Sequence, residues 1–365
     1  VAYRRLGQAR KAEALLRTLL ADNTSLGKVR FELVQALLSQ KRFTTARYQL
    51  NVLLSSENDP SVRRIYRTLD AHINTLRPWS SNIAIDFAPS DNINGGSTRD
   101  SFSVGGRQFA INPESRAQRG WKGRITLDGE YRFLADEKQS AAAFGIVASD
   151  LFSDPDLNRY RGTFGIRYNR EIGKGVSLQT SVAPTLQWTT AGFYSHSFRP
   201  SLRIVLPVGR KWRTGIFASA DYAFFKQTTN SDGWMGHFGA DVTPSITPHT
   251  RLRLAAQFLF SNQGQPAFQY DGYAVTASLE QQLPKRVKID VSVILGQRFY
   301  RAPVALLGTK RRDNFGTMHI VVTKADWAVR GFAPQLKLGY TVNNSNIAFN
   351  HHAGFNAGVG FTRRF

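Results

Sequence analysis

From residue 79 onward, apolar and polar residues alternate with a period of two, the pattern of strands with one apolar and one polar face. In the stretch 121–134, Ile125 and Leu127 fall on one face while Arg124 and Asp128 fall on the other. The polar face of this stretch carries five charges. Such a face does not suit a soluble sheet core, but a water-filled lumen tolerates it. The pattern therefore predicts an all-β, antiparallel transmembrane barrel.

The alternation recurs in about fourteen stretches, an even number that is typical of single-chain bacterial barrels. Short turns alternate with longer loops, of which the longest are 91–119 and 301–313. Short turns face the periplasm in such barrels, so both chain ends are predicted to be periplasmic. The predicted strands are 80–90, 120–134, 140–152, 160–172, 175–190, 196–208, 211–226, 233–247, 250–262, 268–283, 286–300, 314–325, 328–342 and 351–365.

The final stretch, from Ala353 to Phe365, resembles the closing strand of bacterial outer-membrane barrels, because an aromatic residue ends its apolar face. Taken alone, it also fits an edge strand of a soluble sheet. The resemblance implies that Phe365 is an assembly signal for the barrel assembly machinery.

Four prolines interrupt the pattern within predicted strands. Proline cannot donate a ladder hydrogen bond, so we expect bulges or water-filled gaps at these positions. They are Pro184, Pro200, Pro244 and Pro334.

The first 78 residues show a helical period instead. Ala12 and Leu16 recur as Ala46 and Leu50, an offset of 34 residues, which is the period of tetratricopeptide repeats. Because fewer than about three repeats are marginal alone, we expect further repeats upstream or packing against the barrel. The domains are therefore predicted as periplasmic tetratricopeptide-like helices over 1–78 and a barrel over 79–365. The predicted helices are 2–21, 27–40, 43–56 and 60–76.

Tetratricopeptide layers offer a concave surface that holds a polypeptide. Basic side chains on these helices would favour an acidic segment of a client protein. A structural spacer with a solvated charged face is the alternative. The candidate client-binding residues are Arg30, Phe31, Arg63, Arg64 and Arg67.

Composition narrows the possible partners. The 365 residues carry a formal net charge of +22 and contain no cysteine, which excludes disulfides and zinc–thiolate sites. The basic residues are scattered and no nucleic-acid-binding module accompanies them, so we expect contact with outer-membrane lipids and no nucleic acid. No apolar run of about 18 residues predicts a transmembrane helix. No signal peptide is visible, so a leader and further upstream sequence are expected to precede residue 1.

No catalytic arrangement is recognisable. None of the seven histidines belongs to a metal-spaced motif, and no phosphate-binding glycine motif is present. We therefore expect no enzymatic activity, no cofactor and no metal. The charges on the polar strand faces are candidates to line the lumen, and their mixed signs favour mutual pairing. They are Arg124, Asp128, Glu130, Arg132, Arg161, Arg167, Arg203, Asp221, Asp241, Arg253, Glu280, Lys288, Asp290 and Lys337.

The order of these parts resembles a known family. Helical repeats come first, then Asp91, Asn92, Ile93 and Asn94 at the end of the first strand, then strands that finish in Arg-Arg-Phe. This order is similar to the surface lipoprotein assembly modifier family, the outer-membrane component proposed for type XI secretion in Gram-negative bacteria. The resemblance implies an outer-membrane factor that delivers a partner, a surface lipoprotein or a soluble haem-binding relative, across the membrane. We expect it to act as a monomer. A passive diffusion porin and a barrel-embedded hydrolase are the alternatives.

Overall fold

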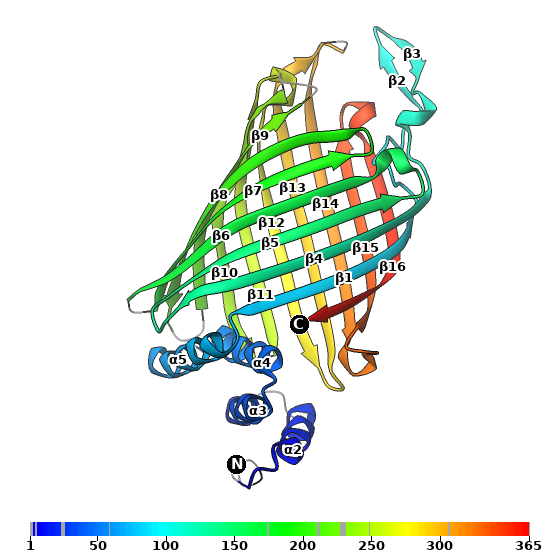
Figure 1. Cartoon of the computed structure of the whole chain (residues 1–365). Coiled ribbons are helices and arrows are strands. Elements are labelled where there is room, and N and C mark those ends of the chain that lie inside the picture. The colour runs from blue at the N-terminus through cyan, green and yellow to red at the C-terminus, as the bar shows by residue number, and fades with distance from the viewer. Residues whose placement is uncertain are drawn as a thin grey trace.

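Fourteen strands among the described residues form a closed antiparallel barrel, with helices at one end (Figure 1), which confirms the predicted fold class. The computed structural model describes the chain except residues 1–2, 4–5, 23–25, 58, 174, 210–211, 227–230, 248, 306 and 365. The assembly signal predicted at Phe365 therefore lies outside the described residues. The barrel strands are β1 (Trp79–Ser90), β4 (Gly120–Ala135), β5 (Gln139–Phe152), β6 (Arg159–Gly173), β7 (Val176–Thr189), β8 (Gly192–Val208), β9 (Trp212–Phe225), β10 (Gly233–Thr247), β11 (Thr250–Gln263), β12 (Tyr270–Leu283), β13 (Val287–Val304), β14 (Thr309–Lys324), β15 (Ala333–Ser345) and β16 (His352–Arg364).

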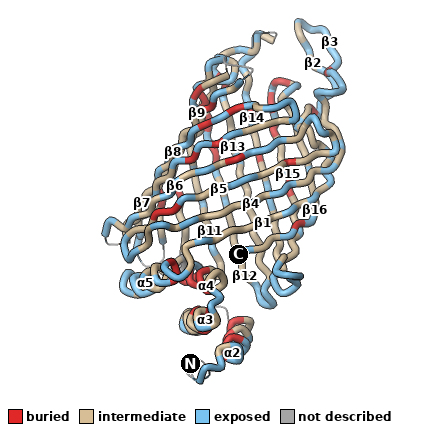
Figure 2. The backbone as a smooth tube through the Cα atoms, in the orientation of Figure 1, coloured by how far each residue is buried: buried red, intermediate tan, exposed pale blue. Residues whose placement is uncertain are grey.

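The barrel wall follows the alternation of the sequence. Ile125 and Leu127 are 43% and 51% exposed, and they face outward, where the bilayer would contact them. Figure 2 accordingly shows most of the wall as intermediate or exposed, with buried residues gathered in the helices and in a few wall segments. Two of the outward aromatic pairs stand at opposite ends of β1: Trp79 with Tyr131, and Phe87 with Trp121. These positions match the interfacial aromatic girdles of membrane barrels.

The predicted strand bounds differ from the structure by up to five residues, at both ends of the barrel. At the helical end, β15 begins at Ala333 and not at residue 328. β13 and β14 extend into the loop expected at 301–313. β8 begins at Gly192, four residues earlier than predicted. The long loop 91–119 contains a hairpin of its own, β2 (Ser101–Val104) and β3 (Arg107–Ala110), which projects beyond the barrel in Figure 1. Gly105 and Gly106 make its turn with φ of 56° and 80°, the left-handed conformation that tight hairpin turns require.

Three of the four in-strand prolines each lie at a gap in one of the two ladders that their strand forms. Pairing between β8 and β9 skips Arg199 and Pro200 and then resumes in the same register, so the strand has a gap and no bulge there. The cause is the missing N–H of proline. Pro334 differs because it stands just before the first pair of β14 with β15. Similar gaps occur at Pro184 and Pro244.

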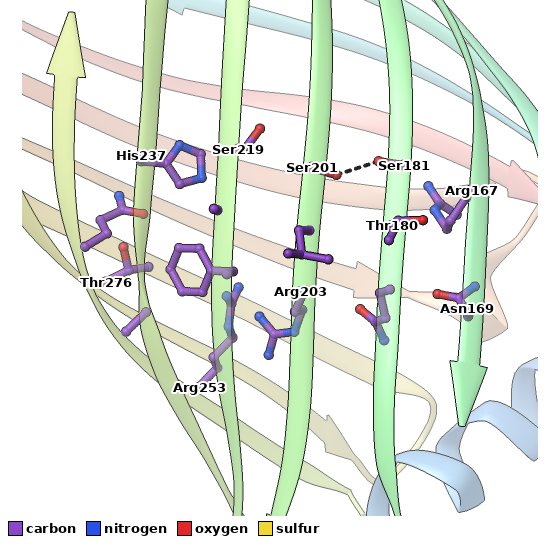
Figure 3. Close-up of a pocket in the computed structure, with 16 residues that line it drawn as sticks. Arg167, Asn169, Thr180, Ser181, Ser201, Arg203, Ser219, His237, Arg253 and Thr276 are labelled. Carbon is purple, nitrogen blue, oxygen red and sulfur yellow. Dashed lines mark hydrogen bonds between the residues drawn. The ribbon is translucent and has the colours of Figure 1, made fainter. Parts of the chain in front are cut away.

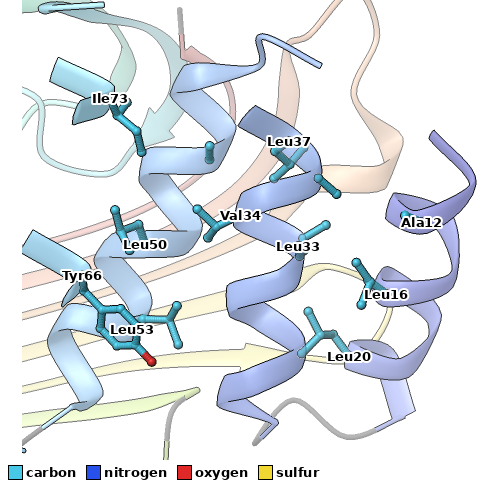
Figure 4. Packing of buried hydrophobic residues seen from close by; sticks show 12 residues of the cluster. Ala12, Leu16, Leu20, Leu33, Val34, Leu37, Leu50, Leu53, Tyr66 and Ile73 are labelled. Carbon is cyan, nitrogen blue, oxygen red and sulfur yellow. The ribbon is translucent and has the colours of Figure 1, made fainter. Parts of the chain in front are cut away.

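The four described helices form a layer with its own apolar core (Figure 4). Leu33, Leu37, Leu50 and Ile73 are at most 1% exposed. The helix predicted over 2–21 is interrupted at Gly7, which adopts a left-handed φ of 73°, and α2 begins after it at Ala9. None of the described helices is long and apolar enough to cross a membrane. The helices are α2 (Ala9–Asp22), α3 (Gly27–Ser39), α4 (Phe43–Ser56) and α5 (Pro60–Leu76).

Candidate functional site

The candidate functional site is the contact between the helical layer, α2 to α5, and the mouth of the barrel. We define the mouth as the end that carries the short turns, such as the one between β4 and β5. In Figure 1, α4 and α5 lie directly beside this end, and α2 and α3 lie farther away. The opposite end carries the β2–β3 hairpin.

Asp70 of α5 is the centre of the first contact. Its Oδ2 accepts a hydrogen bond from Arg132 Nη1 of β4 at 2.7 Å, and its Oδ1 lies 3.5 Å from Arg47 Nε of α4. Arg47 also donates to the carbonyl of Arg77 at 2.9 Å. Asn74, one turn farther along α5, donates to the carbonyl of Arg132 at 3.2 Å. One carboxylate thus joins two helices to the barrel.

A second contact ties α5 to neighbouring strands. Arg67 forms an ion pair with Glu171 of β6. Thr68 donates to Glu137, in the turn between β4 and β5, at 3.1 Å. Burial, together with the charge of Arg63, lowers the pKa of Arg67 to about 10. Since this value is still well above neutral pH, Arg67 remains charged opposite Glu171.

The third contact places α4 over the mouth itself. Tyr48 Oη accepts a hydrogen bond from Gln282 Nε2 of β12 at 3.2 Å, and the guanidinium of Arg364 of β16 lies 5.3 Å from the Tyr48 ring centroid. Three strands, β13 to β15, separate β12 from β16 around the barrel. A side chain that meets both must lie over the opening and not against one wall. On another side, Arg213 of β9 donates to the carbonyls of Leu54 and Glu57.

The polar residues that hold α5 share a spacing in the sequence. Arg63, Arg67, Asp70 and Asn74 follow one another at intervals of four, three and four, which puts them on one helix face. Arg63 donates to the carbonyl of Glu57 at 3.2 Å, on the side where Arg213 binds. The spacing is thus a signal that would have identified Asp70 and Asn74 as docking residues. No comparable signal marks Tyr48.

The predicted client-binding residues do not form one exposed basic face, and their role in client binding stays a prediction. Arg30 is 3% exposed and donates to Gln49 Oε1 at 2.6 Å. Arg63 and Arg67 lie on the α5 face that packs on the barrel. Phe31 packs against Tyr66, with ring centroids 5.6 Å apart. Arg64 alone among the five is exposed.

The charges inside the barrel pair with one another. Asp241 is central on one wall, because Arg203 binds it at 2.5 and 2.7 Å and Arg253 at 3.0 Å. Arg132 belongs to the mouth, where it meets Asp70, and no ion pair is found for Arg161 among the described residues. Asn82 also donates to Asp128 at 3.0 Å. Other lumenal pairs are Arg124–Asp150, Arg167–Glu130, Arg199–Asp221, Lys288–Glu280, Lys288–Asp290 and Lys337–Asp86.

A wall cavity of about 330 Å³ opens beside the Asp241 cluster (Figure 3). Arg203, Arg253 and His237 line it, and Ser181 and Ser201 hydrogen-bond across its rim at 2.6 Å. The cavity is suited to hold water or a polar group between fixed charges. Within the part of the chain that the structure describes, no group of three or more His, Asp or Glu residues is placed to hold a metal.

The Asp91–Asn94 segment lies where β1 leaves the barrel wall. Asp91 Oδ1 accepts from Phe355 N of β16 at 2.6 Å, and Asn92 Nδ2 donates to the carbonyl of Ala353 at 2.8 Å. Asn94 Oδ1 accepts from Gln118 N at 3.1 Å, which joins the two ends of the long loop, as does the bond from Ile93 N to the Gln118 carbonyl at 2.8 Å. The segment therefore fastens the outer end of β1 to β16.

The lipid-facing wall, the paired charges of the lumen and the closed antiparallel sheet define an outer-membrane β-barrel with a helical layer at one end. A family model described as surface lipoprotein assembly modifier matches residues 79–365. The chain therefore belongs to the surface lipoprotein assembly modifier family.

Solved structures with similar architecture are distant. An outer-membrane channel from Pseudomonas putida F1 is 11% identical with a TM-score of 0.41, covering 79% of this chain and 96% of that one. OccAB4 from Acinetobacter baumannii is 9% identical with a TM-score of 0.37, covering 79% and 98%. OprD from Pseudomonas aeruginosa is 8% identical with a TM-score of 0.38, covering 79% and 94%. No curated protein sequence matches the chain.

Proposed function

We propose that this protein delivers a partner protein across the outer membrane, and that it does so without enzymatic activity. The partner is a surface lipoprotein or a related soluble haem-binding protein, in a type XI secretion pathway. The observation that carries the proposal is the position of α4 across the periplasmic mouth, where Tyr48 meets both β12 and β16.

The position of the helices favours delivery over passive diffusion. A layer across the mouth obstructs free solutes, so a diffusion porin gains nothing from it. A delivery factor gains a surface that can bind the partner protein before the partner enters the lumen. Family membership supports this interpretation, because the family is described by its effect on surface lipoproteins.

Two variants of the helices separate capture from support. The first lacks residues 1–76, and the second carries Arg64→Glu, which changes an exposed charge without touching the barrel contacts. The matched control is Arg67→Glu, which places two carboxylates against each other at Glu171 and should loosen docking. The readout is an epitope-tagged surface lipoprotein, co-expressed and measured by flow cytometry per unit of heat-modifiable barrel.

We expect the truncated protein to fold as a barrel while the lipoprotein stays in the periplasm. Arg64→Glu should reduce display of a lipoprotein with an acidic segment and should leave docking intact. Unchanged display in the truncated protein would reduce the helices to a spacer. Surface display of the lipoprotein in cells that lack this protein altogether would refute the proposed function.

A further inference from the structure

The first and last strands of the barrel, β1 and β16, meet at a junction that we call the seam. Within the described residues, the seam pairs run from Asn82–Arg364 to Ser90–Asn356. On its other side, β1 pairs with β4 over its full length, from Trp79 to Ser90. The seam also lacks pairs at Ala88 and Pro89, and proline has no N–H to donate. The ladder that closes the barrel is therefore its shortest over the described residues.

The lumenal face of β16 has few large side chains that could interlock with β1. Gly354, Gly358 and Gly360 lie on it, and Asn356, between the first two, has its side chain against Gly339 of β15. A Cβ at Gly358 would lie 2.2 Å from the carbonyl oxygen of Phe87, and one at Gly360 would lie 2.3 Å from Asp86 Oδ1. The strands approach closely because these side chains are missing. They can therefore separate without moving any bulky lumenal side chain of this part of β16.

Two polar links cross the seam on the lumenal side. Lys337 of β15 reaches over Gly360 to Asp86, with Nζ and Oδ1 2.5 Å apart. Thr362 donates to Asn82 Oδ1 at 2.9 Å. Both links join side chains beside a polar lumen, where water can replace each partner when the link breaks.

The outer end of the seam is held from a loop. We call Asp91 and Asn92 the clasp, because Asp91 exchanges two hydrogen bonds with the backbone of Phe355 at 3.2 and 2.6 Å, and Asn92 binds the carbonyl of Ala353. The bonds of the clasp lie directly beyond Ser90–Asn356, the last regular pair of the seam. Its bonds can break while every other ladder of the barrel stays intact.

We propose that the barrel opens sideways at the seam, with the clasp as the latch, to release a lipid-anchored passenger into the bilayer; this rests on the proposed function. The chemistry of the lumen requires such an exit. Ion pairs such as Arg203–Asp241 line the lumen, and an acyl chain gains nothing there compared with water. An opening between β1 and β16 gives the acyl chain a direct path to hydrocarbon.

Prolines also interrupt three other ladders, but those ladders are built differently. At Pro200 the pairs resume on both sides and continue over most of β8 and β9. Large side chains also interlock on that wall: Arg203 and Arg253 both bind Asp241, across β8 to β11. Among the described ladders, the seam combines short pairing, a glycine-lined strand and a latch from a loop.

The absence of cysteine allows a direct test by disulfide cross-linking. Ala84→Cys with Thr362→Cys joins a paired lumenal position across the seam. Thr317→Cys with Thr341→Cys joins a paired lumenal position of β14 and β15 and serves as the matched control. Cells expressing each pair and a tagged lipoprotein are oxidised, and surface lipoprotein is measured with and without reductant.

We expect oxidation of the seam pair to abolish surface delivery and reductant to restore it, while the control pair delivers in both states. Equal delivery by the two oxidised pairs would overturn the seam proposal and leave the proposed function standing. If the protein without cross-links delivers no lipoprotein, the proposed function fails, and the seam is then judged by a measurement without a passenger.

That measurement is hydrogen exchange of the purified protein in phosphatidylcholine vesicles. Backbone amides of β1 and β16 at the seam should exchange faster than those of β14 and β15. Asp91→Ala with Asn92→Ala should increase exchange at the seam and leave the β14–β15 ladder unchanged. Equal exchange in the two ladders, or no response to loss of the clasp, would refute a seam that opens.

Discussion

Asp70 of α5 accepts a hydrogen bond from Arg132 of β4 at 2.7 Å, and the two residues lie 62 positions apart in the chain. The side chains of both are less than one-fifth exposed. This pair, extended to Arg47, anchors the helical layer on the barrel, and it makes the orientation of the helices testable.

Removing the carboxylate should loosen the helical layer. Asp70→Ala leaves Arg47 and Arg132 without their shared partner, and we expect a loss of about 2 kcal/mol of docking free energy, as for a hydrogen bond to a charged group. The measurement is the rate of limited tryptic cleavage near Arg77. Adding Arg132→Ala to Asp70→Ala should cost less than the two single losses combined, because both variants break one link. Arg64→Ala, at an exposed position, is the control, and an equal effect there would contradict the prediction.

Permeability should report whether α4 closes the mouth. Deleting residues 1–76 should raise the single-channel conductance in planar bilayers, because the helix that spans β12 and β16 is gone. Tyr48→Ala should give a smaller rise, since it removes one side chain from the opening. Identical conductance of the full-length and truncated proteins would show that the helices leave the mouth open.

The helical layer should lose stability in acid through Glu13. Burial opposes its ionisation, but hydrogen bonds from Arg17 and Gln40 and the charges of Arg17 and Arg42 outweigh burial, so the pKa of Glu13 lies below its usual value. Its stabilising contribution is therefore complete above the unfolded pKa of about 4.3 and is lost as pH falls through the folded pKa. Circular dichroism at 222 nm during thermal unfolding measures the effect. Glu13→Gln should weaken the pH dependence of thermal stability. An unchanged dependence would show that groups other than Glu13 cause it.

Surface labelling should distinguish the two ends of the barrel. A cysteine at Ser103, in the exposed β2–β3 hairpin, should react with a membrane-impermeant maleimide on intact cells. A cysteine at Lys138, in the exposed turn between β4 and β5, should react only after the outer membrane is permeabilised. Labelling of Lys138→Cys on intact cells would show that the barrel has the opposite orientation.

Assembly should depend on the terminal aromatic residue. Deleting Phe365 should lower the amount of heat-modifiable, membrane-inserted protein, because the barrel assembly machinery reads such a residue in the proteins that this strand resembles. The measurement is the gel-mobility shift on heating. Phe365→Trp, which keeps an aromatic ring, is the control, and a normal yield after deletion would contradict an assembly role.

The barrel could be predicted from the sequence because alternation is a local property. Ile125 and Leu127 face lipid and Arg124 faces the lumen whatever the partners of their strand are, since successive side chains on a strand point to opposite sides. The strand number, the helices and the position of the boundary between helices and barrel follow from the same short-range signals.

The errors lie where local signals end. β13 and β14 extend beyond their alternating stretch, because two strands that leave the barrel wall together can continue to pair as a hairpin. The sequence shows the charge of the helical arginines but not their neighbours in the folded protein, so it does not predict that Arg67 meets the barrel. Arg67 faces Glu171, a residue about one hundred positions away, and only the packed structure brings them together.

The sequence by itself determined the closed barrel and the presence of a helical layer before it, because both depend on periods of two or 3.6 residues. The tertiary structure alone decided that α4 crosses the mouth, that Asp70 meets Arg132, and that Asp91 and Asn92 fasten β1 to β16. These contacts arise from barrel closure, which brings the first and last strands together and places rim residues from distant strands beneath one helix. No local pattern contains that information, since it depends on the number of strands and on how they are staggered when the barrel closes.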